Sequence, residues 1–120
     1  MLRALIILFS TALLTACGVA ADGGEVQVYR STGAVQCEAN SGRTVEQAQA
    51  QLEDIGVAVS SAACGSQDIM VMTVCGAGTT DIHLLTIARV DLPQAEALGY
   101  RAVAELGSKK APGFQTATCQ

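Results

Sequence analysis

The chain has 120 residues, of which 7 are basic and 11 are acidic, so its formal net charge at neutral pH is −4. Lys109-Lys110 is the only adjacent pair of basic residues. A nucleic-acid surface or a polybasic membrane patch needs a larger cluster of basic residues, so both are excluded. Half of the residues are hydrophobic but only 3% are aromatic. A chain of this length fits one domain, whose core must be built from aliphatic side chains.

The N-terminal segment has the features of an export signal. Arg3 precedes an uncharged, mostly apolar run over residues 4–14, and small residues then lead to Cys17. The run is shorter than the roughly 20 residues that a membrane-spanning helix needs. It has the length of the apolar region of a secretory signal peptide. We therefore expect residues 1–16 to be a signal peptide that is removed on export.

Residues 14–17, Leu-Thr-Ala-Cys, resemble the lipobox of bacterial lipoproteins. The resemblance implies that Cys17 becomes the first residue of the mature protein and is acylated. Several acyl chains anchor a protein to a membrane almost permanently. Gly18, rather than Asp, follows the cysteine, which by similarity to sorting in enteric bacteria implies the outer membrane, with the domain facing the periplasm. The alternative is an ordinary signal peptide in which Cys17 is incidental.

After Cys17, the small and glycine-rich residues 18–24 predict a flexible tether up to a domain at 25–120. In chain order we predict a strand at 25–30, a helix at 44–55, strands at 57–63, 69–75 and 81–90, a short helix from Asp91 to Leu98, a strand at 100–106, and a polar tail at 107–120.

Two of these elements have the strongest patterns. Thr44 and Gln47 form a capping box at the start of the first helix, and Gly56 stands where a glycine ends a helix. The segment 81–90 is apolar on much of both faces, which favours a central strand. The predicted fold is an α+β two-layer sandwich with the order β-α-β-β-β-α-β. Its sheet is mixed or antiparallel, and both helices lie on one face.

Apart from Cys17, the chain has four cysteines: Cys37, Cys64, Cys75 and Cys119. An even number in an exported protein predicts two disulfides. If residues 65–67 form a tight hairpin turn, Cys64 and Cys75 lie about 20 Å apart, whereas a disulfide needs Cα atoms within about 7 Å. Two pairings then remain: Cys37–Cys75 with Cys64–Cys119, or Cys37–Cys64 with Cys75–Cys119.

The first of these pairings is similar to that of the outer-membrane sensor lipoprotein of the Rcs envelope-stress pathway, another small lipobox-anchored domain. The similarity covers the lipobox, a helix after the first cysteine, and strands bearing the second and third cysteines. This chain differs in its long segment after Cys75 and in having no long proline-rich tether. The resemblance implies the pairing Cys37–Cys75 and Cys64–Cys119.

Few residues indicate chemistry. His83 is the only histidine and shares a strand face with Asp81, but no nucleophile motif accompanies them. Met70 and Met72 would project from one face of the predicted strand 69–75. With His83 on a neighbouring strand, their thioethers could bind Cu(I), although such methionines commonly fill cores. There is no Cys-x-x-Cys pair, so redox and haem motifs are absent.

These observations predict a membrane-anchored lipoprotein without cofactor or enzymatic activity, which binds a protein or envelope component or senses the envelope. The alternative is a copper-handling protein or a small enzyme that uses the region of Met70, Met72 and His83.

Overall fold

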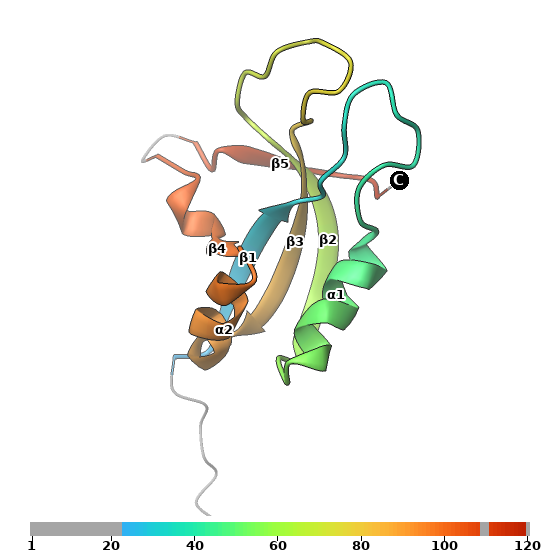
Figure 1. The fold of residues 1–120 in the computed structure, drawn as a ribbon. Helices are drawn as coiled ribbons and strands as arrows, with labels where there is room; N and C mark the ends of the chain where they lie inside the picture. The colour runs from blue at the N-terminus through green and yellow to red at the C-terminus, as the bar shows by residue number, and fades with distance from the viewer. Residues whose placement is uncertain (1–22, 109–110, 120) are drawn as a thin grey trace, which may run out of the picture.

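The computed structural model describes residues 23–108 and 111–119. The predicted signal peptide, the lipidation site Cys17 and tether residues 18–22 lie outside them. Among the described residues, no helix is both long enough and apolar enough to cross a membrane. The elements in chain order are β1 (Glu25–Ser31), α1 (Val45–Asp54), β2 (Val59–Gln67), β3 (Asp81–Ala88), η1 (Arg89–Asp91), α2 (Leu92–Ala97), β4 (Arg101–Ala102), η2 (Val103–Glu105) and β5 (Phe114–Ala117) (Figure 1).

The five strands form one antiparallel sheet in the order β4-β1-β3-β2-β5. The α+β class is therefore confirmed, and of the two sheet types predicted the antiparallel one is present. Strand β3 lies at the centre and pairs with β1 on one side and β2 on the other. Its side chains are buried on both faces, as the apolar pattern of 81–90 predicts: Ile82, Leu84, Leu85 and Ile87.

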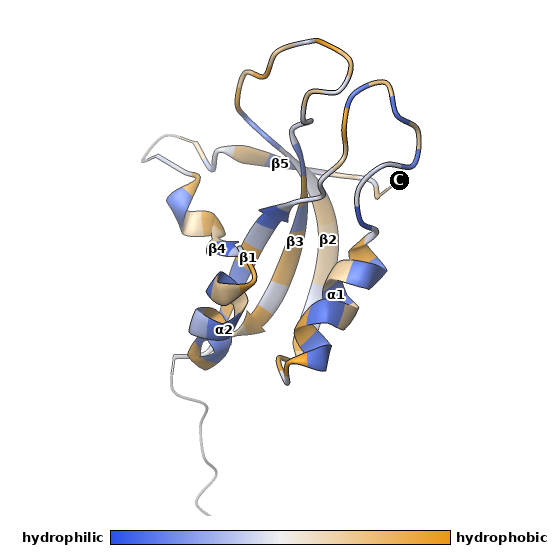
Figure 2. Ribbon diagram, viewed as in Figure 1, coloured by the Kyte–Doolittle hydropathy of each residue, from blue (hydrophilic) through white to orange (hydrophobic). Residues whose placement is uncertain are grey.

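Both helices contribute to one hydrophobic core on a single face of the sheet. Ala48 and Leu52 of α1 and Ala95 of α2 are fully buried in the same cluster as Val28 and Leu85. The last two residues face each other across β1 and β3, so they project from the same side of the sheet. Figure 2 shows apolar residues along β3 and a mixture of polar and apolar residues around α1.

The two helices end in the same way. Gly56 and Gly99 both have a positive φ, +87° and +93°. In each case the glycine N–H and the next N–H donate back to carbonyls of the last turn, as in a Schellman motif. The following residues, Val57 and Tyr100, are fully buried. At the other end of α1, the predicted capping box at Thr44 is present.

The predicted strand at 69–75 is wrong. These residues belong to a long connection between β2 and β3, seen as the upper loop in Figure 1. Strand β2 runs on to Gln67 and pairs directly with β3, so the apolar segment has no neighbouring strand to pair with. An apolar run predicts burial, but here most of its side chains are exposed.

The C-terminal predictions also need correction. The predicted strand 100–106 forms only the two-residue β4 and a 3₁₀ turn, and the predicted polar tail contains a strand, β5, paired with β2. The observed order is thus β-α-β-β-α-β-β. The local sequence does not predict β5, because this strand depends on pairing with β2, which is far away in the chain. From β4 at one edge, the chain reaches β5 at the other. Figure 1 shows β5 passing behind the sheet, away from α1 and α2.

Candidate binding surfaces

Two disulfides brace the domain. Cys37 bonds to Cys75 and Cys64 bonds to Cys119, with a Cα–Cα distance of 5.1 Å in each. This is the pairing that the resemblance to the sensor lipoprotein implies. The first bond joins the loop after β1 to the loop after β2, and the second ties the C-terminal segment to β2. Both therefore hold segments that the sheet alone holds weakly.

The loop after β2 presents a set of exposed apolar side chains, which we call the apolar loop. Its exposed members are Ile69, Met70, Val71, Met72 and Val74. Met70 is fully exposed and Met72 is 76% exposed. Single exposed apolar residues are common on protein surfaces, but a contiguous group marks a site of interaction.

The apolar loop is held in place by Gln36, which lies beside the Cys37–Cys75 bond. The side-chain amide of Gln36 donates to the carbonyl oxygens of Met72 (2.6 Å) and Gly78 (3.0 Å). Its amide oxygen accepts from the backbone N–H of Val74 (3.1 Å). The loop therefore has a defined backbone without belonging to the sheet. Sequence reasoning missed Gln36, whose only signal was its position next to a cysteine.

The apolar loop lies at the end of the sheet opposite to the N-terminus of the domain. Glu25 pairs with Ala88 at one end of β1, whereas Ser31 pairs with Ile82 at the other. The loop joins β2 to β3 at this second end (Figure 1). Because β1 has seven residues, its first and last Cα atoms lie about 20 Å apart along the strand.

A second candidate site surrounds His83, which is only 2% exposed. Its Nδ1 has no hydrogen-bond partner among the described residues. Burial lowers the pKa of His83, and the charges of Arg30 and Arg43 lower it further, against smaller opposing effects of Glu46 and the Arg43 backbone. The imidazole is therefore neutral at neutral pH.

Arg30 lies opposite His83 on β1 and is engaged by other groups. Its guanidinium donates to the carbonyl oxygen of Leu98 (2.7 Å) and to Gln51 Oε1 (2.8 Å). It also lies over the ring of Tyr100, 4.5 Å from the centroid. Burial lowers the pKa of Arg30 and raises that of Tyr100. These contacts make a polar layer at one end of the aliphatic core.

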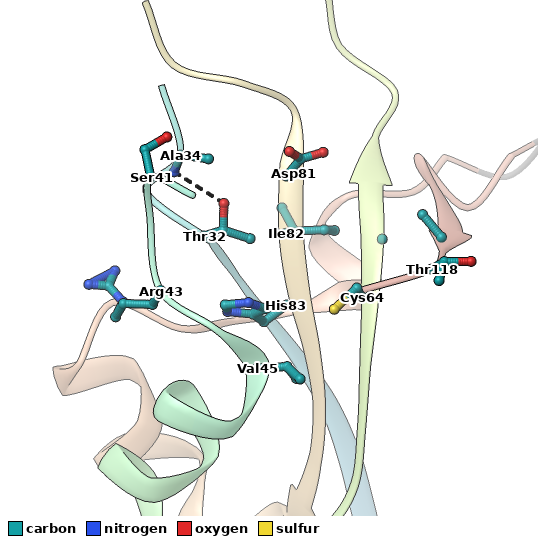
Figure 3. Close-up of a pocket in the computed structure, with 12 residues that line it drawn as sticks. Thr32, Ala34, Ser41, Arg43, Val45, Cys64, Asp81, Ile82, His83 and Thr118 are labelled. Atoms are coloured by element: carbon teal, nitrogen blue, oxygen red, sulfur yellow. Dashed lines mark hydrogen bonds between the residues drawn. The ribbon is translucent and has the colours of Figure 1, made fainter. Parts of the chain in front are cut away.

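A pocket of about 130 Å³ lies beside His83. Its floor is the start of β3, and its walls come from the segment that leads into α1 and from the segments joined by Cys64–Cys119 (Figure 3). The polar residues that line it are Thr32, Ser41, Arg43, Asp81, His83 and Thr118.

The structure places the three predicted metal ligands apart. Met70 and Met72 are exposed on the apolar loop, whereas His83 is buried in β3 beside a pocket that neither methionine lines. Within 23–108 and 111–119, no three His, Cys, Asp or Glu residues form a group that could hold a metal. Asp81 and His83 line the same pocket, but no hydrogen bond joins the Asp81 carboxylate to the unpartnered His83 Nδ1.

Comparison with known proteins adds no relative. No protein-family model, no curated protein and no solved structure matches this chain. The apolar loop and the pocket beside His83 are the features of the described residues that bear on function.

Proposed function

We propose that this protein is a lipoprotein, anchored to the outer membrane through Cys17, whose two-layer α+β domain binds a protein in the periplasm through the apolar loop. The observation that carries the proposal is the exposed apolar group from Ile69 to Val74, whose backbone is bound by Gln36 and joined to the neighbouring loop by the Cys37–Cys75 bond. A preformed apolar surface binds without paying the cost of ordering a flexible loop.

The position of the apolar loop, at the end of the domain away from the tether, supports binding of a partner in the periplasm. Residues 18–24 connect Cys17 to the start of β1, so the tether leaves the domain at the end away from the apolar loop. A lipid on Cys17 would then hold the near end at the membrane and leave the apolar loop free to meet a partner.

The surroundings of the loop indicate the chemistry of the partner. Met70 and Met72 are flexible thioether side chains that adapt to the shape of an apolar pocket. Asp68 precedes the apolar loop and Glu38 follows the bonded Cys37, and both acids are exposed. The partner would therefore offer an apolar pocket with basic residues at its rim.

Site-specific crosslinking in membranes tests this proposal. With a photoreactive residue in place of Met70, we expect one adduct of defined mass, which is lost when Met72→Ser and Val74→Ser are added. The same residue in place of the exposed Gln94 on α2 is the matched control and should give no such adduct. Equal adducts at both positions, or none at Met70 in a protein shown by mass spectrometry to carry acylated Cys17, would contradict the proposal.

The copper-handling alternative has less support. The strand that would direct Met70 and Met72 to one face is absent, and His83 is buried away from them. A copper titration tests this alternative directly, because copper handling needs the region of Met70, Met72 and His83 to bind metal and partner binding through the apolar loop does not.

A further inference from the structure

We propose that Met70 and Met72 form an oxidation site for oxidants of the hypohalous acid class, and that their conversion to sulfoxides prevents the apolar loop from binding its partner. This inference rests on the partner binding proposed above and adds its regulation. It concerns a covalent modification of two side chains, and it requires no metal and no second binding site.

Both methionines of the described chain lie where an oxidant can reach them. Met70 is fully exposed and Met72 is 76% exposed. No methionine belongs to the buried core of the described residues, although methionine commonly fills gaps in such cores. Met1, the third methionine of the sequence, lies in the predicted signal peptide. The thioethers of the described domain are therefore both on the surface that we propose for partner binding.

Other groups that react with such an oxidant are absent or protected in the described part of the chain. The sequence contains no tryptophan, and its only histidine, His83, is buried. The four cysteines from Cys37 to Cys119 are all in disulfides. The two thioethers are thus the only reduced sulfur atoms within residues 23–108 and 111–119. Because susceptibility to oxidation follows exposure, we expect them to react first.

The reaction adds one oxygen atom to each thioether. The Sδ atom gives two electrons to hypochlorous acid, an S–O bond forms, and the O–Cl bond of the oxidant breaks. Chloride and one proton pass to the solvent. The product is a sulfoxide, which is polar where the thioether was apolar. The change is reversible, because methionine sulfoxide reductases return the sulfoxide to the thioether.

Oxidation should change the surface of the apolar loop without unfolding the domain. The loop is held through the backbone carbonyl oxygen of Met72, which accepts from the Gln36 side chain (2.6 Å), and through Cys37–Cys75. Neither contact uses a thioether. A sulfoxide oxygen that enters an apolar pocket loses its hydrogen bonds to water, which is unfavourable unless the pocket supplies a donor. Partner binding should therefore weaken at least about tenfold while the fold stays intact.

Peptide mass mapping locates the oxidation. The full-length protein, with its disulfides intact, is treated in detergent micelles with a few molar equivalents of hypochlorous acid and quenched with free methionine. We expect one added oxygen on Met70 and one on Met72 before any other described residue changes, with an unchanged midpoint of urea denaturation. Earlier oxidation of other residues, or a lower midpoint in protein oxidised only at these two, would contradict the proposal.

Crosslinking measures the effect on binding. A photoreactive residue replaces Ile69, another exposed member of the apolar loop, so that both methionines remain. The treated and quenched protein is added to membranes from cells that lack it. We expect the adduct formed by untreated protein to fall at least about tenfold and to return after incubation with methionine sulfoxide reductases. Met70→Leu/Met72→Leu keeps the loop apolar, and its adduct should not change on the same treatment.

The outcomes separate this inference from the proposal on which it rests. An untreated protein that gives no adduct contradicts partner binding itself, and the oxidation site then fails with it. An adduct that persists at full strength after both sulfoxides have formed overturns only the oxidation site. Equal losses in the wild type and in Met70→Leu/Met72→Leu would place the effect on another group and would also overturn it.

Discussion

Three polar residues lie on the helix-covered face of an otherwise aliphatic core. Arg30 is tolerated there because backbone, amide and aromatic partners surround its guanidinium. Tyr100 supplies the aromatic ring and is fully buried. Each of the three also has one buried side-chain atom without a hydrogen-bond partner among the described residues: Arg30 Nε, His83 Nδ1 and Tyr100 Oη. The burial of His83 lowers its pKa in the folded state and so makes the stability of the protein depend on pH.

We predict that the protein becomes less stable as the pH falls below about 6.5. Burial, followed by the charges of Arg30 and Arg43, holds the pKa of His83 below its usual 6.5 in the folded state. Below that pH the unfolded chain binds a proton that the folded protein does not, which favours unfolding. Urea denaturation at about pH 7.5 and pH 5.5 measures the effect. His83→Gln should lose less stability over this range than the wild type, and an equal loss in both would contradict the assignment.

At the scale of elements, the contact between β2 and β5 is unusually close. Gly65 pairs with Thr116, and a Cβ at Gly65 would lie 2.7 Å from the Gln115 carbonyl oxygen and 3.0 Å from Leu84 Cδ1. A glycine at this position lets the last strand approach the sheet where Leu84 is buried.

Gly65→Ala should therefore destabilise the protein by about 1–3 kcal/mol, because either β5 or the buried Leu84 must move. Gly78→Ala is the matched control: a Cβ added at Gly78 would have no atom of the described chain within 4 Å, and we expect a change within about 0.5 kcal/mol. Chemical denaturation of both variants provides the comparison. Similar free energies of unfolding for the two would show that β5 does not pack closely against β2.

At the scale of the whole molecule, the two disulfides have different tasks. Cys64–Cys119 spans 55 residues and secures β5, whose side chains are mostly exposed, to the edge of the sheet at β2. Cys37–Cys75 spans 38 residues and joins two loops beyond the end of the sheet. Cys64–Cys119 thus attaches the last strand to the sheet, and Cys37–Cys75 shapes the surface that we propose for partner binding.

Replacing Cys64 and Cys119 by alanine should cost about 2–4 kcal/mol and should abolish the hydrogen-exchange protection of β5 while β1 and β3 remain protected. In the Cys37→Ala/Cys75→Ala protein, β5 should stay protected and crosslinking at Met70 should weaken. Persistent protection of β5 without Cys64–Cys119 would show that strand pairing alone secures the C-terminal segment.

The sequence determined the parts of this protein that depend on local interactions. The capping box at Thr44 and Gly56, the glycine that ends the first helix, act through neighbouring residues. The segment 81–90 is apolar on both faces, which predicts a central strand regardless of which other strands pair with it. These features were readable without knowing the fold.

Tertiary structure alone decided the rest. The segment 69–75 has the composition of a buried strand, but β2 already occupies the edge of β3 that it would need. β5 is short and mostly exposed, so only its pairing with β2 and the bond to Cys119 identify it. The pocket beside His83 combines residues of β3, the loop before α1 and the C-terminal segment. Such contacts between distant segments leave no periodic signal in the chain, because each depends on which surface the folded sheet leaves unpaired.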